Sequence, residues 1–360
     1  MKFNFLIFFL LVGLLGIFLP YNYAFGAPEP EQPLPLPPSL HSSRSTLKPP
    51  TISQQEDNQL EAITLYLTII REDDKNSWAP YQLASALASK GQREMAERYL
   101  KMSSQRGLWY YYNLLEDPAF NNMRDSAIFQ QVLAETKERY QQQAQRYEAK
   151  SFDTVPSGKA PPNGWPVIIY LHNFGDSARV NDDKKAFYRQ MGYVYIEING
   201  TQMLSENSFR WSTYNAESTQ QAVQNSLTEV AQKTPLNRRQ VYLIGRGQGA
   251  LHAANLLAKY PKDYAGGMII SPYGKIKSES HTDAKDKRLF FVTFNEQESL
   301  SRDYISNFKR IFTPHNHVYE GRYTADADNM KLWNERFYHP LMWLTGTGNM
   351  PAAPNIHRDS

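Results

Sequence analysis

Few side chains of this 360-residue chain have a type and spacing that could do chemistry. His315 and His317 are two positions apart, so in a strand both imidazoles would lie on one face, as two metal ligands could. No further ligand is identifiable beside them, and we therefore expect no metal site. Gly245, Gly247 and Gly249 alternate with other residues, but not with the spacing of a dinucleotide-binding loop. The sequence predicts no cofactor.

The overall composition excludes several classes of protein. The 39 basic and 36 acidic side chains leave a net charge of only +3, without the concentrated basic footprint of a nucleic-acid-binding protein. We therefore expect no nucleic-acid partner. The chain has no cysteine, which excludes a thiol nucleophile, a thiolate metal site, a disulfide framework and a bacterial lipid anchor.

The N-terminus has the pattern of an export signal. Lys2 supplies a positive charge, and Phe5 to Leu19 is an unbroken run of apolar residues and glycine that Pro20 ends. Small residues at Ala24 to Gly26 suit signal peptidase, so we interpret residues 1–26 as a cleaved signal peptide. In a bacterial host the protein would then be periplasmic or secreted. The alternative is an uncleaved N-terminal membrane anchor, for which the apolar run is slightly short.

A proline-rich stretch and a helical region follow the signal. Residues 27–55 predict an extended linker, because proline fixes φ and removes a hydrogen-bond donor. Residues 56–150 have helical apolar spacing and predict a small all-α domain. The expected helices are Leu60 to Ile70, Trp78 to Ser89, Arg93 to Ser104 and Ile128 to Glu148.

The two middle helices, divided by Lys90-Gly91, resemble a tetratricopeptide-type hairpin. The positions where that repeat places its packing residues hold Leu83, Ala84 and Leu87 in one helix and Ala96, Leu100 and Ser103 in the other. The resemblance implies a surface that binds a protein partner. The alternative is a helical cap over the domain that follows.

From residue 151 to residue 360 the pattern changes to alternating strands and helices. This alternation predicts a doubly wound, mostly parallel sheet of the α/β class. The expected strands are Val167 to Leu171, Tyr193 to Ile198, Gln240 to Ile244, Gly267 to Ile270, Leu289 to Phe294 and about His317 to Glu320, with helices at Ala216 to Gln232 and Ala250 to Tyr260.

Within this domain a recognisable segment runs from Val241 to Ala250, Val-Tyr-Leu-Ile-Gly-Arg-Gly-Gln-Gly-Ala. It resembles the strand, sharp turn and helix of the predicted-esterase and phospholipase/carboxylesterase group of α/β-hydrolases. Ala258 to Gly267 resembles the segment that closes that helix, and Tyr170 to Gly175 resembles the family's first oxyanion-loop segment. The match covers roughly residues 164–343 and implies an α/β-hydrolase fold.

The chain departs from this family at the catalytic positions. The family's nucleophilic serine falls on Gly247, which has no side-chain oxygen. Glu298 is the best-aligned candidate for the catalytic acid, whereas the place of the catalytic histidine holds Gly321 to Thr324. The resemblance therefore implies an inactive site with vestigial positions Gly247, Glu298 and Thr324. We also expect glycine to relax a strained turn, so that Gly247→Ser would destabilise the protein.

The family's oxyanion hole would be built by the backbone N–H groups of Phe174 and Gln248. These donors could still hold a small ester or an anion, but Asn173 stands where the family usually has glycine, which alters the loop. His172 and His252 are interpreted as structural. The aromatic clusters Trp109 to Tyr112 and Phe209 to Trp211 are interpreted as packing.

Three functions stay open at this point. The first is an exported, catalytically inactive esterase homologue that acts by binding, with the helical domain as its partner surface. The second is an active carboxylesterase-like or phospholipase-like hydrolase that uses a non-standard residue, for instance Ser212 or His339. The third is a structural envelope protein in which both domains are scaffold. Contact with a membrane is expected only through an uncleaved signal segment.

Overall fold

The computed structural model describes residues 52–147, 151–179, 182–212, 216–276, 285–294, 299–323 and 330–347. The expected signal peptide, nearly all of the linker, Glu298 and Thr324 lie outside these ranges. The chain divides between Arg146 and Tyr147 into two compact units. Each unit is described by itself below.

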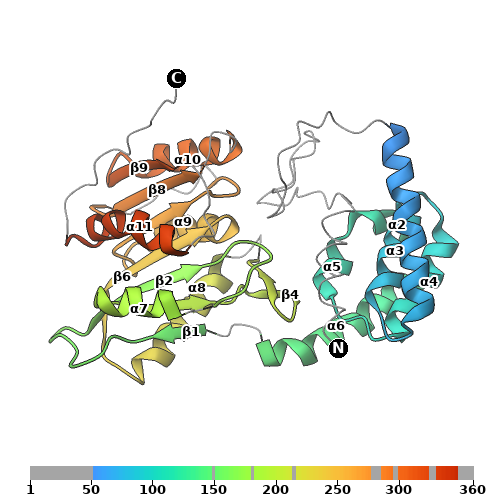
Figure 1. Ribbon diagram of the computed structural model, residues 1–360, viewed down its shortest axis with the longest axis horizontal. Helices are drawn as coiled ribbons and strands as arrows, with labels where there is room; N and C mark the ends of the chain where they lie inside the picture. The colour runs from blue at the N-terminus through green and yellow to red at the C-terminus, as the bar shows by residue number, and fades with distance from the viewer. Residues whose placement is uncertain are drawn as a thin grey trace. The chain divides into compact units, whose positions relative to one another are not determined.

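The first unit is helical. Its α2 begins within the expected linker and is longer than the sequence predicts, because the helix also includes the polar residues that precede Leu60. None of the helices in the described ranges is both long and apolar enough to cross a membrane. The elements are α2 (Ile52–Glu72), α3 (Trp78–Ser89), α4 (Arg93–Gln105), α5 (Tyr111–Glu116), the 3-10 helix η1 (Pro118–Met123) and α6 (Ala127–Tyr147) (Figure 1).

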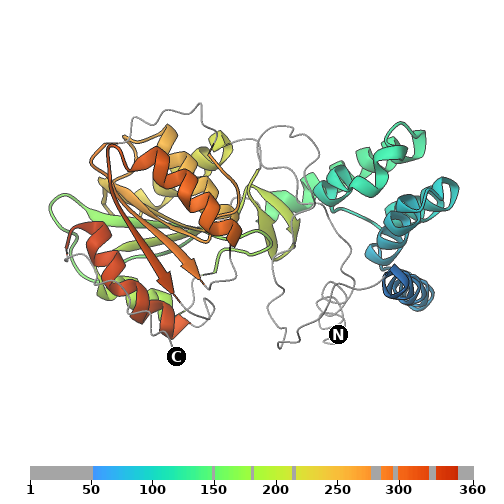
Figure 2. The same ribbon diagram turned by 90° about the horizontal axis from the view of Figure 1, so that it is seen from above.

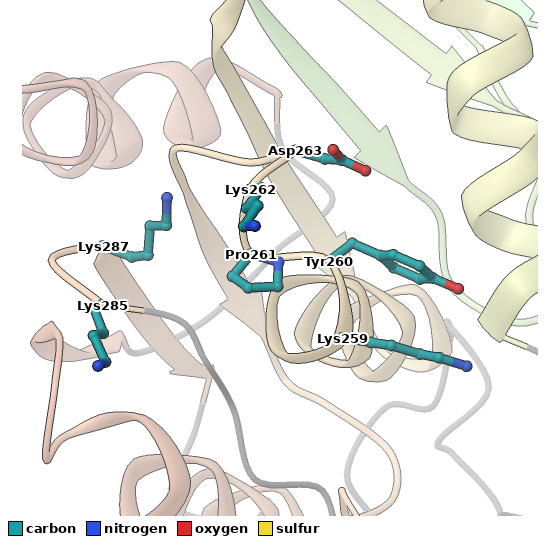
Figure 3. A pocket seen from close by; sticks show the side chains of 7 residues that line it. All are labelled: Lys259, Tyr260, Pro261, Lys262, Asp263, Lys285 and Lys287. Carbon is teal, nitrogen blue, oxygen red and sulfur yellow. The ribbon is translucent and has the colours of Figure 1, made fainter.

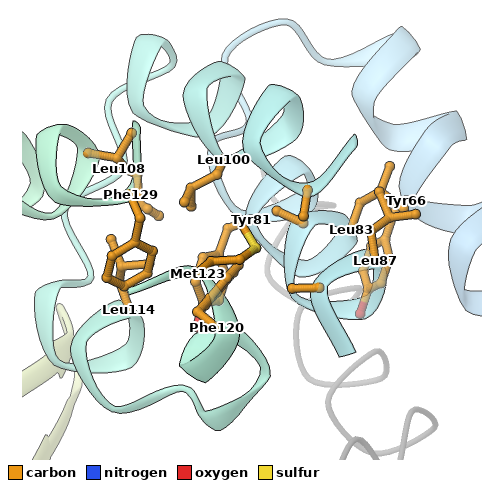
Figure 4. Packing of buried hydrophobic residues seen from close by; sticks show 14 of the residues in the cluster. Tyr66, Tyr81, Leu83, Leu87, Leu100, Leu108, Leu114, Phe120, Met123 and Phe129 are labelled. Carbon is orange, nitrogen blue, oxygen red and sulfur yellow. The ribbon is translucent and has the colours of Figure 1, made fainter. Parts of the chain in front are cut away.

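The core of this unit joins the expected hairpin to the helices after it. Leu83 of α3 and Leu100 of α4 are fully buried, and Phe120 and Phe129 bring η1 and α6 into the same cluster (Figure 4). The guanidinium of Arg106 donates to the carbonyl oxygens of Ile70 (3.1 Å) and Asp73 (2.9 Å), so it caps the carboxyl end of α2. The α3–α4 pair is therefore one layer of a continuous helical core.

The second unit is built on a seven-stranded sheet in the order β1-β3-β2-β6-β7-β8-β9. Strand β1 pairs antiparallel with β3, and every other neighbouring pair in this sheet is parallel. A separate hairpin is formed by β4 (Gln202–Ser205) and β5 (Ser208–Arg210). The sheet strands are β1 (Ser151–Thr154), β2 (Trp165–Leu171), β3 (Val194–Ile198), β6 (Leu236–Arg246), β7 (Gly266–Ile270), β8 (Arg288–Phe294) and β9 (His317–Tyr323) (Figure 1).

Helices cover both faces of the sheet, as two neighbouring glycines of β7 show. A Cβ atom on Gly266 would contact Leu344 of α11 (3.2 Å), whereas one on Gly267 would contact Leu257 of α9 (2.7 Å). Figure 2 shows α7 and α11 on one face and α8, α9 and α10 on the other. The predicted fold class, an α/β-hydrolase fold with a mostly parallel, doubly wound sheet, is confirmed. The helices are α7 (Asp182–Gln190), α8 (Ala216–Ala231), α9 (Gln248–Lys259), α10 (Ser299–Phe312) and α11 (Met330–Thr345).

Some expectations need correction. Strand β6 begins four residues before the expected Gln240, because its polar first half still pairs with β2 at Trp165. The spacing of His315 and His317 does not place both on one strand, which agrees with the expected start of the strand at about His317. His315 is in the turn after α10, where its N–H donates to the carbonyl of Phe312 (3.3 Å), and only His317 belongs to β9.

Candidate functional site

The sharp turn between β6 and α9, here called the elbow, has Gly247 at its centre. Gly247 has φ +56° and ψ −117°, a conformation that side chains with a Cβ adopt only under strain. Its N–H donates to the carbonyl of Ile270 (2.9 Å), and its own carbonyl accepts from the N–H of Tyr273 (3.1 Å). The neighbouring strand β7 and the loop after it therefore hold the elbow in place.

The elbow packs tightly against the end of β2. A Cβ atom on Gly249 would overlap the carbonyl oxygens of Leu171 and His172. Helix α9 can therefore begin against the end of this strand only if position 249 is glycine. This close approach brings the loop after β2, with Asn173 and Phe174, next to the elbow.

The Asn173 side chain fills the space that a side chain at position 247 would occupy. An ideal Cβ on Gly247 would overlap the Oδ1 and Cγ atoms of Asn173. The same Oδ1 accepts a hydrogen bond from the backbone N–H of Gln248 (3.1 Å), one of the two donors expected for an oxyanion hole. The other expected donor, the backbone of Phe174, belongs to a half-buried residue in the same loop. An amide oxygen of the chain itself thus accepts from one of the two donors expected for an oxyanion hole.

Trp211 links the elbow to the loop after β2. The Gln248 side chain accepts from the Trp211 N–H and donates to the Trp211 carbonyl, both at 2.9 Å. The Trp211 indole is fully buried and donates through Nε1 to the carbonyl of His172 (2.8 Å). The Trp211 ring lies 5.3 Å from the ring of His172 and 5.8 Å from the ring of His252.

His172 is held in one neutral tautomer by two backbone contacts. Its Nδ1–H donates to the carbonyl of Asn173 (2.6 Å), and its Nε2 accepts from the N–H of Gly200 (2.8 Å). This tautomer follows from the partners, since a backbone N–H can only donate. Burial lowers the pKa of His172 to about 4, although the bond to Asn173 opposes the shift. These contacts agree with a structural role for His172, because both ring nitrogens are engaged.

His252 lies on α9, one turn beyond the elbow, and is almost completely buried. Its Nδ1 is 2.8 Å from Oγ1 of Thr219 on α8. Burial lowers the pKa of His252 to about 3, so the ring is neutral at physiological pH. Together with His172, it places two uncharged imidazoles around the Trp211 ring.

The remaining candidates are not assembled into a catalytic group. Ser212 follows Trp211 and donates its N–H to Oγ1 of Thr201 (3.2 Å). In the described ranges, its hydroxyl makes no hydrogen bond to a histidine. His339 is exposed on α11, whose face of the sheet is opposite that of α9. Among these same residues, no group of three or more histidines and carboxylates could hold a metal ion.

Comparisons with known proteins do not assign a function to this chain. No protein-family model matches the chain, and no curated protein matches it. Similar solved structures include an uncharacterized protein from Bacillus cereus (14% identity, covering 83% of this chain and 100% of that one, TM-score 0.39). They also include a carboxylesterase of Bacillus cereus (15%, 52% and 93%, TM-score 0.40). A third is Est1E from Butyrivibrio proteoclasticus with bound ferulic acid (12%, 55% and 95%, TM-score 0.40). At these values the similarity carries no argument about activity, and the fold assignment rests on strand order and the elbow.

Two residues that the sequence did not place at the elbow determine its chemistry. Asn173 was recognised only as a departure from glycine, and Trp211 only as packing. A signal that could have pointed to Asn173 is the combination of a glycine at the nucleophile position with a hydrogen-bonding side chain in the oxyanion loop. No pattern in the sequence points to the contact between Trp211 and Gln248.

Proposed function

We propose that this chain is an exported α/β-hydrolase-fold protein that does not hydrolyse esters and acts by binding or as a scaffold. The observation that supports this most strongly is the position of the Asn173 carboxamide. It occupies both the space of a side chain at position 247 and the acceptor position on the Gln248 N–H. Gly247 stands where the resembled family has its nucleophilic serine, at a sharp turn with φ +56° and ψ −117°.

The chemistry of acyl transfer supports the same conclusion. The reaction needs a nucleophile at the elbow and N–H donors directed at the developing oxyanion. Gly247 supplies no nucleophile, and an ester carbonyl could reach the Gln248 N–H only by displacing the Asn173 oxygen. In serine hydrolases, loss of the nucleophile alone lowers kcat by about a millionfold. Residues 318–338 also contain no histidine that could serve as the base.

A small ester or anion at Phe174 and Gln248 remains the proposed ligand of this site, under one condition. The Asn173 side chain must rotate away before the ligand binds, which breaks its bond to Gln248 and costs about 1 kcal/mol. Ligand affinity at the elbow would therefore increase when Asn173 is shortened.

The helical unit is proposed as the surface for a protein partner. In the α3–α4 hairpin, the residues at the packing positions of a tetratricopeptide-type repeat are buried. Leu83 and Ala84 of α3 share one core with Ala96 and Leu100 of α4. The half-buried aromatic residues from Trp109 to Tyr112 lie beside this core. Aromatic side chains of this kind can supply contact area for a partner.

The activity proposal is tested on the purified protein with short-chain aryl esters and a fluorophosphonate probe. We expect no hydrolysis above the buffer rate and no added mass on the intact protein, because the elbow has no hydroxyl. A single labelled serine, lost in Ser212→Ala or in another single serine variant, would establish the alternative of a hydrolase with a non-standard nucleophile.

A further inference from the structure

An open hollow of about 430 Å³ lies at the amino ends of β7 and β8, away from the elbow. Four lysines line it, and they come from two segments of the chain (Figure 3). Lys259 and Lys262 belong to the end of α9 and the loop after it, whereas Lys285 and Lys287 precede β8. The elbow follows β6 and contacts the carboxyl ends of β2 and β7, whereas the hollow opens where β7 and β8 begin.

The backbone holds the second segment in a defined position. Asp286, between the two lysines, has φ +56°, an uncommon conformation for a residue with a side chain. Its N–H donates to the carbonyl of His315 (2.9 Å), and the N–H of Lys287 donates to Oδ1 of Asn316 (3.0 Å). The carbonyl of Lys287 accepts from the N–H of His317 (2.8 Å). Lys285 and Lys287 are therefore presented by an anchored turn.

The acidic groups nearby form an ion pair with only one of the four lysines among the described residues. Glu217 forms an ion pair with Lys259, and Asp263 accepts a hydrogen bond from the Gln220 side chain (2.7 Å). The Asp263 carboxylate points away from Lys285 and Lys287 (Figure 3). Asp286 is the acid whose charge acts on Lys287.

Three of the lysines have no ion-pair partner among the residues that the structure describes. Across the described parts of the chain, no carboxylate lies within salt-bridge distance of Lys262, Lys285 or Lys287. Partial burial also lowers the pKa of Lys287, because its ammonium group loses water, although the negative charge of Asp286 opposes this shift. Like charges in one hollow repel each other, and a bound anion would convert this repulsion into attraction.

We propose that this hollow binds a ligand through phosphate groups. Lysine binds phosphate as a point charge, and three lysines around one hollow suit a compact anion with more than one negative charge. A nucleic acid fits the site less well, because Tyr260 alone among the residues that line the hollow is aromatic, and single-stranded nucleic acids bind to a series of aromatic side chains. The phosphate could belong to a soluble molecule or to the headgroup of an anionic lipid.

The site is independent of the proposed function at the elbow. Strand β7 (Gly266–Ile270) separates the two places, since the hollow lies before Gly266 and the elbow is bound to Ile270. At about 3.3 Å per residue, this is on the order of 15 Å. A substitution at the hollow therefore leaves the Asn173–Gly247 contact intact.

The test uses the full chain and inorganic pyrophosphate as the soluble probe, with calorimetry at low salt. Lipid binding is measured by sedimentation with vesicles of phosphatidylcholine, alone or mixed with phosphatidic acid. The variant Lys262→Gln/Lys287→Gln removes two of the unpaired cations. The matched control is Lys101→Gln, which removes an exposed lysine of α4.

We expect the wild-type protein and Lys101→Gln to bind pyrophosphate or the phosphatidic acid vesicles equally well. The double variant should bind at least about tenfold more weakly, which corresponds to about 1.4 kcal/mol. Binding of pyrophosphate identifies a soluble phosphate ligand, and binding of vesicles alone identifies a lipid headgroup. Absence of binding to both probes, or binding that the double variant retains in full, would overturn the proposal.

Discussion

The carboxyl ends and the amino ends of the parallel strands differ in whether their polar side chains have partners within the chain. At the carboxyl ends, the Gln248 N–H, the Gln248 side chain and both ring nitrogens of His172 have partners within the chain. At the amino ends, Lys262, Lys285 and Lys287 line an open hollow without a carboxylate at ion-pair distance in the described ranges.

This difference teaches where a ligand could gain binding energy. A ligand at the elbow must replace hydrogen bonds that already exist, so only the difference between the old and the new bonds contributes to affinity. An anion at the lysine hollow replaces only water and relieves repulsion between cations. The carboxyl ends of the strands, where ligands of open α/β sheets usually bind, thus have their polar groups paired within the chain. The unpaired charge lies at the amino ends.

The largest effect should come from the buried histidines at the carboxyl ends of the strands. The pKa of His172 is about 4 in the folded state, below about 6.5 for the unfolded chain, so the folded state binds fewer protons. Stability should therefore fall as the pH decreases from 6.5 towards 4, by up to about 1.4 kcal/mol per pH unit for this residue. In urea unfolding, His172→Gln should reduce this slope.

Exposed His339 on α11 supplies the control for that measurement. The variant His339→Gln should keep the slope of the wild-type protein. An unchanged slope in His172→Gln would mean that the imidazole at the elbow is not held neutral by burial.

Gly247→Ser should have the next largest effect. The new side chain meets both an unfavourable φ and the Asn173 carboxamide, so we expect a loss of about 2–4 kcal/mol in the free energy of unfolding. Gly158→Ser is the matched control, because Gly158 also has a positive φ (+93°) but no atom within 4 Å of a Cβ. Equal losses in the two variants would show that Asn173 does not obstruct position 247.

Gln248→Ala should be slightly less harmful. It leaves the buried N–H and carbonyl of Trp211 without their side-chain partners, at a cost of about 1–3 kcal/mol. Gln221→Ala on the exposed face of α8 removes only a bond to Asn225 and should change stability by less than about 0.5 kcal/mol. Thermal unfolding of both variants measures the difference, and similar midpoints would remove the Trp211 contact from this account.

The smallest effect should appear at the amino ends of the strands. Lys287→Met removes a partly desolvated cation from a group of like charges, so we expect a gain of a few tenths of a kcal/mol at low salt. The gain should disappear at about 1 M salt, where screening acts over roughly 3 Å. Melting curves at both salt concentrations test this, and destabilisation at low salt would show that the lysine has an internal partner.

The sequence predicted the fold better than the fine structure of the site. Strands such as β3 and β8 are short apolar runs, and the glycines at 245, 247 and 249 marked the elbow between strand and helix. Strand β1 was not predicted, because Ser151–Thr154 is short and polar and pairs only at the edge of the sheet. The boundary between the units, expected after residue 150 where helical spacing changes to alternating strands and helices, lies at the end of α6, between Arg146 and Tyr147.

The contents of the elbow could not be predicted from local patterns. The bond between Asn173 and Gln248 joins residues 75 positions apart and depends on the rotamer of one amide side chain. The convergence of Lys262 with Lys285 and Lys287 likewise depends on the pairing of β7 with β8. Both features arise from tertiary contacts that no spacing within one segment encodes.

The most direct test of this account is a double-mutant cycle between Asn173 and Gly247, measured by urea unfolding. The cost of Gly247→Ser is determined in the wild-type protein and again in Asn173→Ala, where the space beside position 247 is empty. We predict that the substitution costs at least about 1 kcal/mol less in the Asn173→Ala protein, because only the backbone strain remains. An equal cost in both proteins would contradict the claim that the Asn173 carboxamide fills the nucleophile's place.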